Sequence, residues 1–182
     1  MIDDTLRQKF EQTIEERIER CLEVSHQRVI PGHHFAEASA QCIDLYTDGY
    51  FLSTIMVTQA VAEGIQKLIR ERNGISAPAP EKGPELVHLL IAKGIITSIC
   101  GEAFNRIWGS YRNDLHHMNP GAAKVTYPVS SDLAKRNIQD LAVIEKEIFA
   151  VNLRNGALIP VQAKYWDIGP DGRAPIYLRC DR

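Results

Sequence analysis

The 182-residue sequence lacks the features that define several common classes of protein. Its four cysteines lie far apart without a CxxC pair, which argues against a zinc ribbon and gives no disulfide framework. No segment approaches the roughly 20 consecutive apolar residues of a membrane-spanning helix. The first residues are acidic and lack the apolar run of a signal peptide. We therefore expect no membrane association and a reducing, cytoplasmic location. The cysteines are Cys21, Cys42, Cys100 and Cys180.

The sequence also lacks a large excess of either charge. Twenty-one basic and 23 acidic residues give a formal net charge of −2, so no global basic field recruits nucleic acid. The local distribution is different, because the segment 104–136 holds five cations and two anions, a local charge of +3. The cations are Arg106, Arg112, Lys124, Lys135 and Arg136, and the anions are Asp114 and Asp132.

Apolar periodicity predicts a mainly α-helical chain. Apolar residues recur every four positions from Leu6 to Leu22 among charged residues, which predicts an amphipathic helix over 3–27. Further helices are predicted over 33–46, 50–72, 85–99, 101–118 and 131–149, with Ser131 as the N-cap of the last. The proline-rich segment 75–84 is predicted to be a loop.

The C-terminal part changes character. Segments 157–168 and 174–180 have the composition of strands, and Gly169-Pro170-Asp171-Gly172 between them predicts a hairpin turn. An isolated hairpin is marginal in water, so this one must pack on the helices or on a partner. We therefore predict a helical bundle over 1–150, with a C-terminal β-hairpin appendage over 151–182 packed on the same domain.

One short segment carries the candidate chemistry. Between Tyr111 and Pro120, Arg112 is followed directly by Asn113 and then by His116 and His117. Histidine exchanges a proton near neutral pH, and arginine is a permanent forked cation that matches a phosphate. These residue types suit RNA cleavage without a metal. Asn119-Pro120-Gly121 is predicted to end the helix that carries them.

The arginine, the polar residue after it and the histidine at the fifth following position resemble the Arg-x4–6-His signature of the HEPN superfamily. The resemblance covers the helices from about 50 to 149 and leaves the first two helices and the hairpin unexplained. It implies a metal-independent endoribonuclease without a cofactor. It also implies a homodimer in which two motif helices share one RNA site, and a place in a toxin or anti-phage system with a possible antitoxin.

The resemblance assigns roles residue by residue. Arg112 is expected to bind and polarise the scissile phosphate, a histidine to act as general base or acid at the ribose 2′-hydroxyl, and Asn113 to orient them. The choice of histidine stays open, because family spacing selects His117, which we prefer, whereas residues four apart share a helix face and this selects His116. Tyr111 and Lys124 are predicted to contact substrate.

Other interpretations of these residues remain. Arg112 could form a surface salt bridge with Asp114, and the histidines could cap the end of the helix. Glu63 could be a surface residue paired with Lys67, or it could support Arg112. Asp114 is also expected to lie close to the catalytic residues.

Two further alternatives concern larger groups of residues. His33, His34 and Glu37 could form a metal cluster with the motif histidines, although nothing in the sequence brings these segments together. The chief functional alternative is a non-catalytic helical module that binds a nucleotide, RNA or a partner protein. A small interaction protein whose hairpin edge pairs with another chain is a third.

Overall fold

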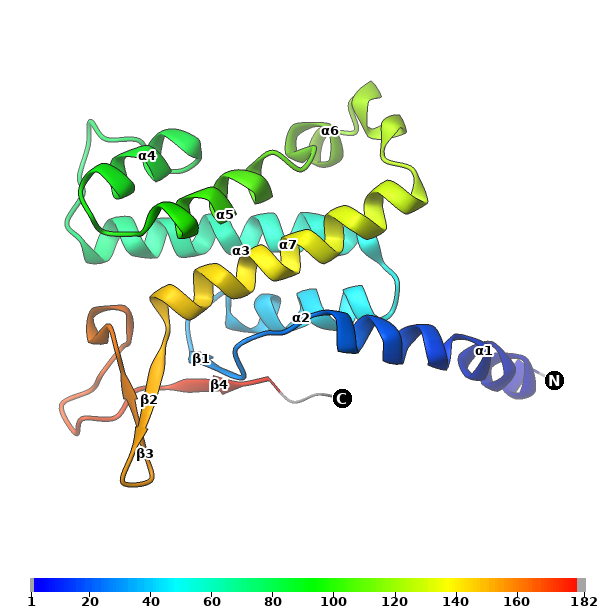
Figure 1. Ribbon diagram of the computed structural model, residues 1–182, viewed down its shortest axis with the longest axis horizontal. Helices are drawn as coiled ribbons and strands as arrows, with labels where there is room; N and C mark the ends of the chain where they lie inside the picture. The colour runs from blue at the N-terminus through cyan, green and yellow to red at the C-terminus, as the bar shows by residue number, and fades with distance from the viewer. Residues whose placement is uncertain (1, 180–182) are drawn as a thin grey trace.

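The computed structural model describes residues 2–179, apart from the side chains of Ile2, Leu6 and Lys9, so Cys180 lies outside the described residues. The fold is mainly α-helical with small two-stranded antiparallel sheets (Figure 1). In chain order its elements are α1 (Ile2–Glu23), β1 (Val29–Pro31), α2 (Ala36–Thr47), α3 (Phe51–Arg72), α4 (Pro84–Ala92), α5 (Ser98–Trp108), α6 (Arg112–His117), the 3-10 helix η1 (Pro120–Lys124), α7 (Tyr127–Ile148), β2 (Val151–Arg154), β3 (Ala157–Pro160), the 3-10 helix η2 (Ala163–Tyr165) and β4 (Ile176–Leu178).

Helices α3 and α7 lie at the centre of the molecule. Each packs against the other and against α5, while α2 covers the opposite side of α3 and α4 covers α5 (Figure 1). Ile55, Ile65 and Ile69 of α3 and Ile144 of α7 are fully buried in the shared core. Burial of each such side chain contributes about 1.5–3 kcal/mol, so this core stabilises α3, against which α6 packs. No helix within residues 2–179 is long and apolar enough to cross a membrane.

Several of the predicted helix boundaries were wrong, among them the end of the first helix, which is Glu23 and not residue 27. The helix expected over 85–99 ends at Ala92, because Gly94 adopts a positive φ of 64°. The helix expected over 101–118 is two helices, since Tyr111 at φ 54° interrupts it after α5 and before α6. The last helix begins at Tyr127, so Ser131 lies inside α7 and is not its N-cap.

The predicted hairpin lies elsewhere in the C-terminal region. Strand β3 pairs with β2, which precedes it, through a turn at Asn155 and Gly156, with φ of 50° and 79°. Asn-Gly with two positive φ angles is the preferred two-residue hairpin turn. The 169–172 segment does form a turn, with Gly172 N bonded to Gly169 O, but the strand after it, β4, pairs with β1 near the other end of the chain.

The C-terminal segment is anchored in the helical core. Tyr165 is fully buried and Trp166 is 3% exposed, so both side chains are packing residues of the core. His33 Nε2 donates to the carbonyl oxygen of Tyr165 at 2.8 Å, and its Nδ1 lies 3.3 Å from a carboxylate oxygen of Asp167. The chain therefore returns over the start of α2 before β4 pairs with β1.

Candidate functional site

The motif residues lie where the short helix α6 packs against α3. Residues four apart share one side of an α-helix, so Arg112 and His116 project from the same face of α6. The same spacing on α3 places Gln59 beside Glu63. Nη2 of Arg112 donates to Oε2 of Glu63 at 2.9 Å. Nε2 of His116 lies 3.2 Å from Oε1 of Gln59, so the two rows pair in antiparallel order.

The guanidinium of Arg112 is held from two directions. Its Cζ lies 4.4 Å from the centroid of the Trp108 ring at the end of α5, a cation–π contact, while Glu63 binds it from α3. Helix α6 is bounded by left-handed residues, Tyr111 at φ 54° and Met118 at φ 50°. The break at Tyr111 redirects the chain after Trp108, which lets Arg112 fold back over the ring.

Glu63 gathers three cations around one carboxylate. Besides Arg112, Nζ of Lys67 lies 2.9 Å and Nζ of Lys82 lies 2.8 Å from Oε1 of Glu63, whose side chain is 14% exposed. Burial alone would raise the pKa of Glu63, but hydrogen bonds from Lys82 and Lys67 outweigh it and lower the pKa to about 2. Glu63 is therefore ionised throughout the neutral range. We call Glu63, Lys67, Lys82, Arg112 and His116 the basic corner.

A buried hydrogen-bond network orients Gln59. Its Nε2 donates at 3.0 Å to both the carbonyl and the hydroxyl oxygen of Ser110, and Asn137 donates to the same hydroxyl at 3.0 Å. Because the amide nitrogen is used in this way, Oε1 of Gln59 is an acceptor and Nε2 of His116 must donate to it. In the neutral ring, Nδ1 of His116 is then the basic nitrogen.

The protonation of His116 also depends on its surroundings. Partial burial and the positive charges of Arg112 and His117 lower the pKa of His116, while Glu63 acts weakly in the opposite direction. A lowered pKa keeps the imidazole neutral at neutral pH. His116 is therefore able to accept a proton under those conditions.

Arg112 and His116 line one cavity of about 250 Å³. Its wall also includes His34 from the turn before α2, and Lys67 and Glu63 from α3. Gly64 forms part of the same wall, and a Cβ at this position would lie 3.0 Å from the Phe35 ring. The cavity thus combines two imidazoles, an arginine and a lysine around a space with a partly apolar wall.

A second hollow of about 610 Å³ lies on the other side of Arg112. Tyr111, Asn113 and Asp114 line it together with Trp108. The alternative interpretation of a salt bridge between Arg112 and Asp114 is not found, since the ion-pair partner of Arg112 among residues 2–179 is Glu63. The Asp114 carboxylate packs on Gly121, where an added Cβ would come within 2.2 Å of Oδ2.

Two of the predicted site residues lie outside both hollows. His117 and Lys124 are exposed, and neither is among the described residues that line these spaces. The local basic patch is also partly neutralised, because Arg106 binds Asp140 and Lys135 binds Glu23. The structure thus brings Arg112, His116 and Glu63 together and leaves His117 apart from them within one chain.

The histidines of the metal alternative separate in the fold. His33 contacts Asp167 and Tyr165, whereas His34 lines the cavity with His116. Within residues 2–179, no group of three His, Cys, Asp or Glu side chains is placed to hold a metal ion.

Four residues of this site were not predicted from the sequence: Gln59, Lys67 as a cavity residue, Lys82 and Trp108. A four-residue spacing indicates that three of the side chains on α3 share one face of the helix, namely Gln59, Glu63 and Lys67. Lys82 carried no such signal, because it comes from the loop before α4 and meets Glu63 only in the folded chain.

No family model matches this chain, and comparisons with curated proteins and with solved structures find no match. The assignment of function therefore depends on the chemistry of the basic corner.

Proposed function

We propose that this protein is an endoribonuclease of the HEPN type that cleaves RNA by attack of the ribose 2′-hydroxyl. The observation that carries the proposal is that Arg112 and His116 line one cavity, with Nδ1 of His116 as its basic nitrogen. Residues 50–148 also form a bundle of α3, α4, α5 and α7 that presents the motif near the end of the bundle, as the resemblance implies.

The reaction follows from these groups. Nδ1 of His116 accepts the proton of the 2′-hydroxyl, whose oxygen bonds to phosphorus as the bond from phosphorus to the 5′-oxygen breaks. Arg112 and Lys67 stabilise the negative charge on the phosphate oxygens. The leaving oxygen takes a proton from an imidazolium, and we assign this step to exposed His117 of a second copy. The products are a 2′,3′-cyclic phosphate and a 5′-hydroxyl.

The test is cleavage of a labelled RNA in EDTA by the full chain. We expect Arg112→Ala and His116→Ala to lower the rate at least 100-fold, since removal of one charge-stabilising or proton-transfer group costs about 10²–10³. His88→Ala and Arg154→Ala, which alter exposed residues away from the site, are the matched controls and should cleave normally. DNA of the same sequence should be resistant, because it lacks the 2′-hydroxyl.

Two results would contradict the proposal. Full activity of Arg112→Ala would remove the phosphate-binding role on which it depends. If His117→Ala is inactive while His116→Ala is unaffected, the assignment of the base to His116 is wrong and family spacing selects the correct histidine.

A non-catalytic module that binds phosphate groups is the second candidate. The observation that favours it is that Glu63 already neutralises Arg112, Lys67 and Lys82 within the free chain. RNA binding that depends on Arg112, without cleavage by the unmodified protein, would select this function. A role in defence with an antitoxin is a proposal that comes from the resemblance alone.

A further inference from the structure

Helix α1 carries an apolar stripe that the rest of the described chain leaves exposed. Phe10, Ile14, Ile18 and Leu22 recur every four residues and are 52%, 40%, 48% and 81% exposed. Figure 1 shows α1 extending away from the helical core beyond the end of α2. Scattered exposed apolar residues need no explanation, but a continuous row of large ones marks an interaction surface.

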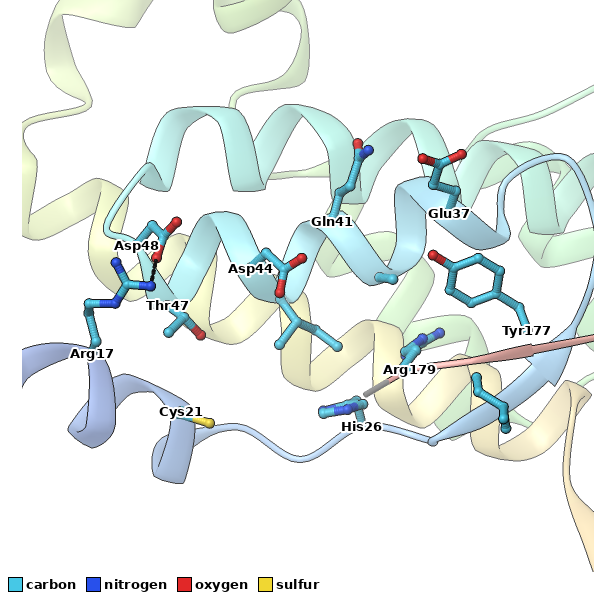
Figure 2. Close-up of a pocket in the computed structure, with 13 residues that line it drawn as sticks. Arg17, Cys21, His26, Glu37, Gln41, Asp44, Thr47, Asp48, Tyr177 and Arg179 are labelled. Atoms are coloured by element: carbon cyan, nitrogen blue, oxygen red, sulfur yellow. Dashed lines mark ion pairs between the residues drawn. The ribbon is translucent and has the colours of Figure 1, made fainter. Parts of the chain in front are cut away.

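A groove runs beside this stripe, between α1, α2 and β4, and encloses about 510 Å³ (Figure 2). Arg17 and Cys21 form its wall on α1. Ile14 and Ile18 each precede one of these residues by three positions, and residues three apart are neighbours on a helix surface. The apolar stripe therefore borders the groove along its length.

The opposite wall of the groove is acidic. Glu37 and Asp44 follow one another along α2, and Asp48 comes directly after the helix, as Figure 2 shows. Asp48 is paired with Arg17 at 2.7 Å. Within residues 2–179, no ion pair or side-chain hydrogen bond reaches Glu37 or Asp44. We call this space, with its three acidic residues, the acidic groove.

The other border of the stripe is also acidic. Glu11, Glu15 and Glu19 are exposed. They are spaced four residues apart and lie on the side of α1 away from the acidic groove. Helix α1 as a whole carries seven acidic and four basic residues, a formal charge of −3. The apolar stripe is thus flanked by carboxylates on both sides.

We propose that the apolar stripe of α1 and the acidic groove together bind a cationic amphipathic helix of another protein. Its apolar face would cover Ile14 and Ile18, and its Lys or Arg residues would reach Glu37 and Asp44. An amphipathic helix binds in this way when its apolar residues lie on one face and its charges complement those around the groove. This interaction is separate from the basic corner and does not depend on the proposed nuclease activity.

Charge placement disfavours a second copy of this chain as the occupant. If two α1 helices met antiparallel along the stripe, the edge with Glu11, Glu15 and Glu19 would face the same edge of the other copy. If they met parallel, the glutamate edge of one copy would face the edge of the other copy that contains Arg17. Arg17 is already paired with Asp48 and so would not neutralise the glutamates. A membrane surface fits less well still, because helices that lie on anionic lipid are rich in Lys and Arg.

The test uses a fluorescent synthetic helix of leucine and lysine whose leucines line one face, with a shuffled peptide of the same composition as control. We expect the full chain to bind the first peptide and not the second. The double variant Ile14→Ser/Ile18→Ser should weaken binding at least ten-fold. Glu37→Gln/Asp44→Asn should weaken it several-fold and reduce its dependence on salt.

Matched variants keep this test specific. Ile99→Ser/Leu153→Ser removes two exposed apolar residues elsewhere, at 65% and 72% exposure, and Glu85→Gln removes an exposed charge on α4. All should bind normally. All of the altered residues are exposed or line the open groove, so circular dichroism should show unchanged folding.

Several outcomes would overturn the proposal. These are equal binding of the shuffled peptide, no binding of either peptide, or normal binding by both double variants. Self-association in analytical ultracentrifugation that Ile14→Ser/Ile18→Ser abolishes would assign the surface to a second copy. Binding to phosphatidylserine vesicles that the same variant abolishes would assign it to a membrane.

Discussion

The basic corner and the acidic groove organise charge in opposite ways. In the basic corner, three cations meet one carboxylate, and each is fixed by a contact of 2.8–2.9 Å to Glu63. Of the three acidic residues of the acidic groove, Asp48 alone has an ion pair among the described residues, and Glu37 and Asp44 face the open space. The charges of the basic corner are paired with one another within the chain. The carboxylates of the acidic groove are instead complementary to a partner that carries positive charge.

The two regions also differ in their apolar surroundings. Arg112 packs on Trp108, and the helices beneath it bury their apolar residues in the core. Beside the acidic groove, the apolar residues of α1 remain exposed. A preorganised charged site over a rigid core suits chemistry, because catalytic groups must be held before the substrate arrives. An exposed apolar row beside carboxylates that have no ion-pair partner within residues 2–179 suits association.

The largest expected effect concerns the buried cation at the end of the acidic groove. Arg179, which lies beside Tyr177 in Figure 2, does not neutralise the carboxylates of the groove, since it binds Glu145 and Ser39 instead. Its side chain is 3% exposed and that of Glu145 is 1% exposed. Arg179→Ala would leave a buried carboxylate without its partner, so we expect the free energy of unfolding to fall by about 3–5 kcal/mol. Urea unfolding measures this loss.

Two variants control for that result. Arg173→Ala removes an exposed arginine close to β4 and should change stability by less than about 0.5 kcal/mol. Arg179→Met combined with Glu145→Leu removes both buried charges and should recover most of the loss. A loss below about 1 kcal/mol in Arg179→Ala would mean that this arginine is free to serve the acidic groove after all.

The second prediction tests whether the basic corner is satisfied internally. The pKa of Glu63 is lowered to about 2 in the folded chain, so its ionised form stabilises the fold above its ordinary pKa of 4.5. This contribution, about 3 kcal/mol, is lost as the pH falls from 4.5 toward 2. Thermal unfolding of the unmodified protein should therefore lose stability over this range more steeply than unfolding of Glu63→Gln.

Glu85→Gln, which alters an exposed carboxyl on α4, is the control and should follow the unmodified protein. Identical pH profiles for Glu63→Gln and the unmodified protein would show that the lysines and Arg112 do not depend on Glu63. The contrast between the two regions would then be lost.

Much of the helical core was predictable from the sequence, and the reasons are local. The helix over 50–72 was predicted within one residue of α3, because its apolar spacing and its Asn73-Gly74 stop are both encoded in that segment. The hairpin was predicted with the wrong pair of strands. Both 169–172 and Asn155-Gly156 have the composition of a turn, and the prediction placed the hairpin turn at 169–172, whereas it lies at Asn155-Gly156. The pairing of β1 with β4 joins distant parts of the chain, and no local pattern reports it.

In the candidate site, too, the features that depend on local spacing were predictable and those that depend on packing were not. Arg112 and His116 share a helix face by spacing alone, so helix geometry was enough to predict their proximity. The contact with Glu63 and the stacking on Trp108 depend on how α3, α5 and α6 pack. The sequence offered the Glu63 contact only as a possibility and gave no indication of the Trp108 contact. The exposure of the α1 stripe could not be predicted from the sequence, since periodicity shows that a face is apolar but not whether anything covers it.

The third prediction concerns coupling within the basic corner. Burial, Arg112 and His117 lower the pKa of His116, so its ring should titrate below the ordinary value for histidine. Removal of the cation in Arg112→Gln should raise that pKa, whereas Arg154→Gln on the hairpin should not change it. Histidine ring signals followed by NMR across pH 4 to 9 measure both titrations. Unchanged titration in Arg112→Gln would mean that Arg112 and His116 do not act as one electrostatic unit.

The smallest expected effect is at the acidic groove, where Arg17 and Asp48 join α1 to α2. Their side chains are 33% and 36% exposed, so solvent screens the pair and its coupling should be about 0.2–1 kcal/mol. A double-mutant cycle with Arg17→Ala and Asp48→Ala measures this coupling, which should decrease in 1 M salt. A weak coupling leaves α1 free to adjust around a partner at little cost. A coupling above about 2 kcal/mol would instead make this wall of the groove as firmly paired as the basic corner, and the two regions would no longer differ in kind.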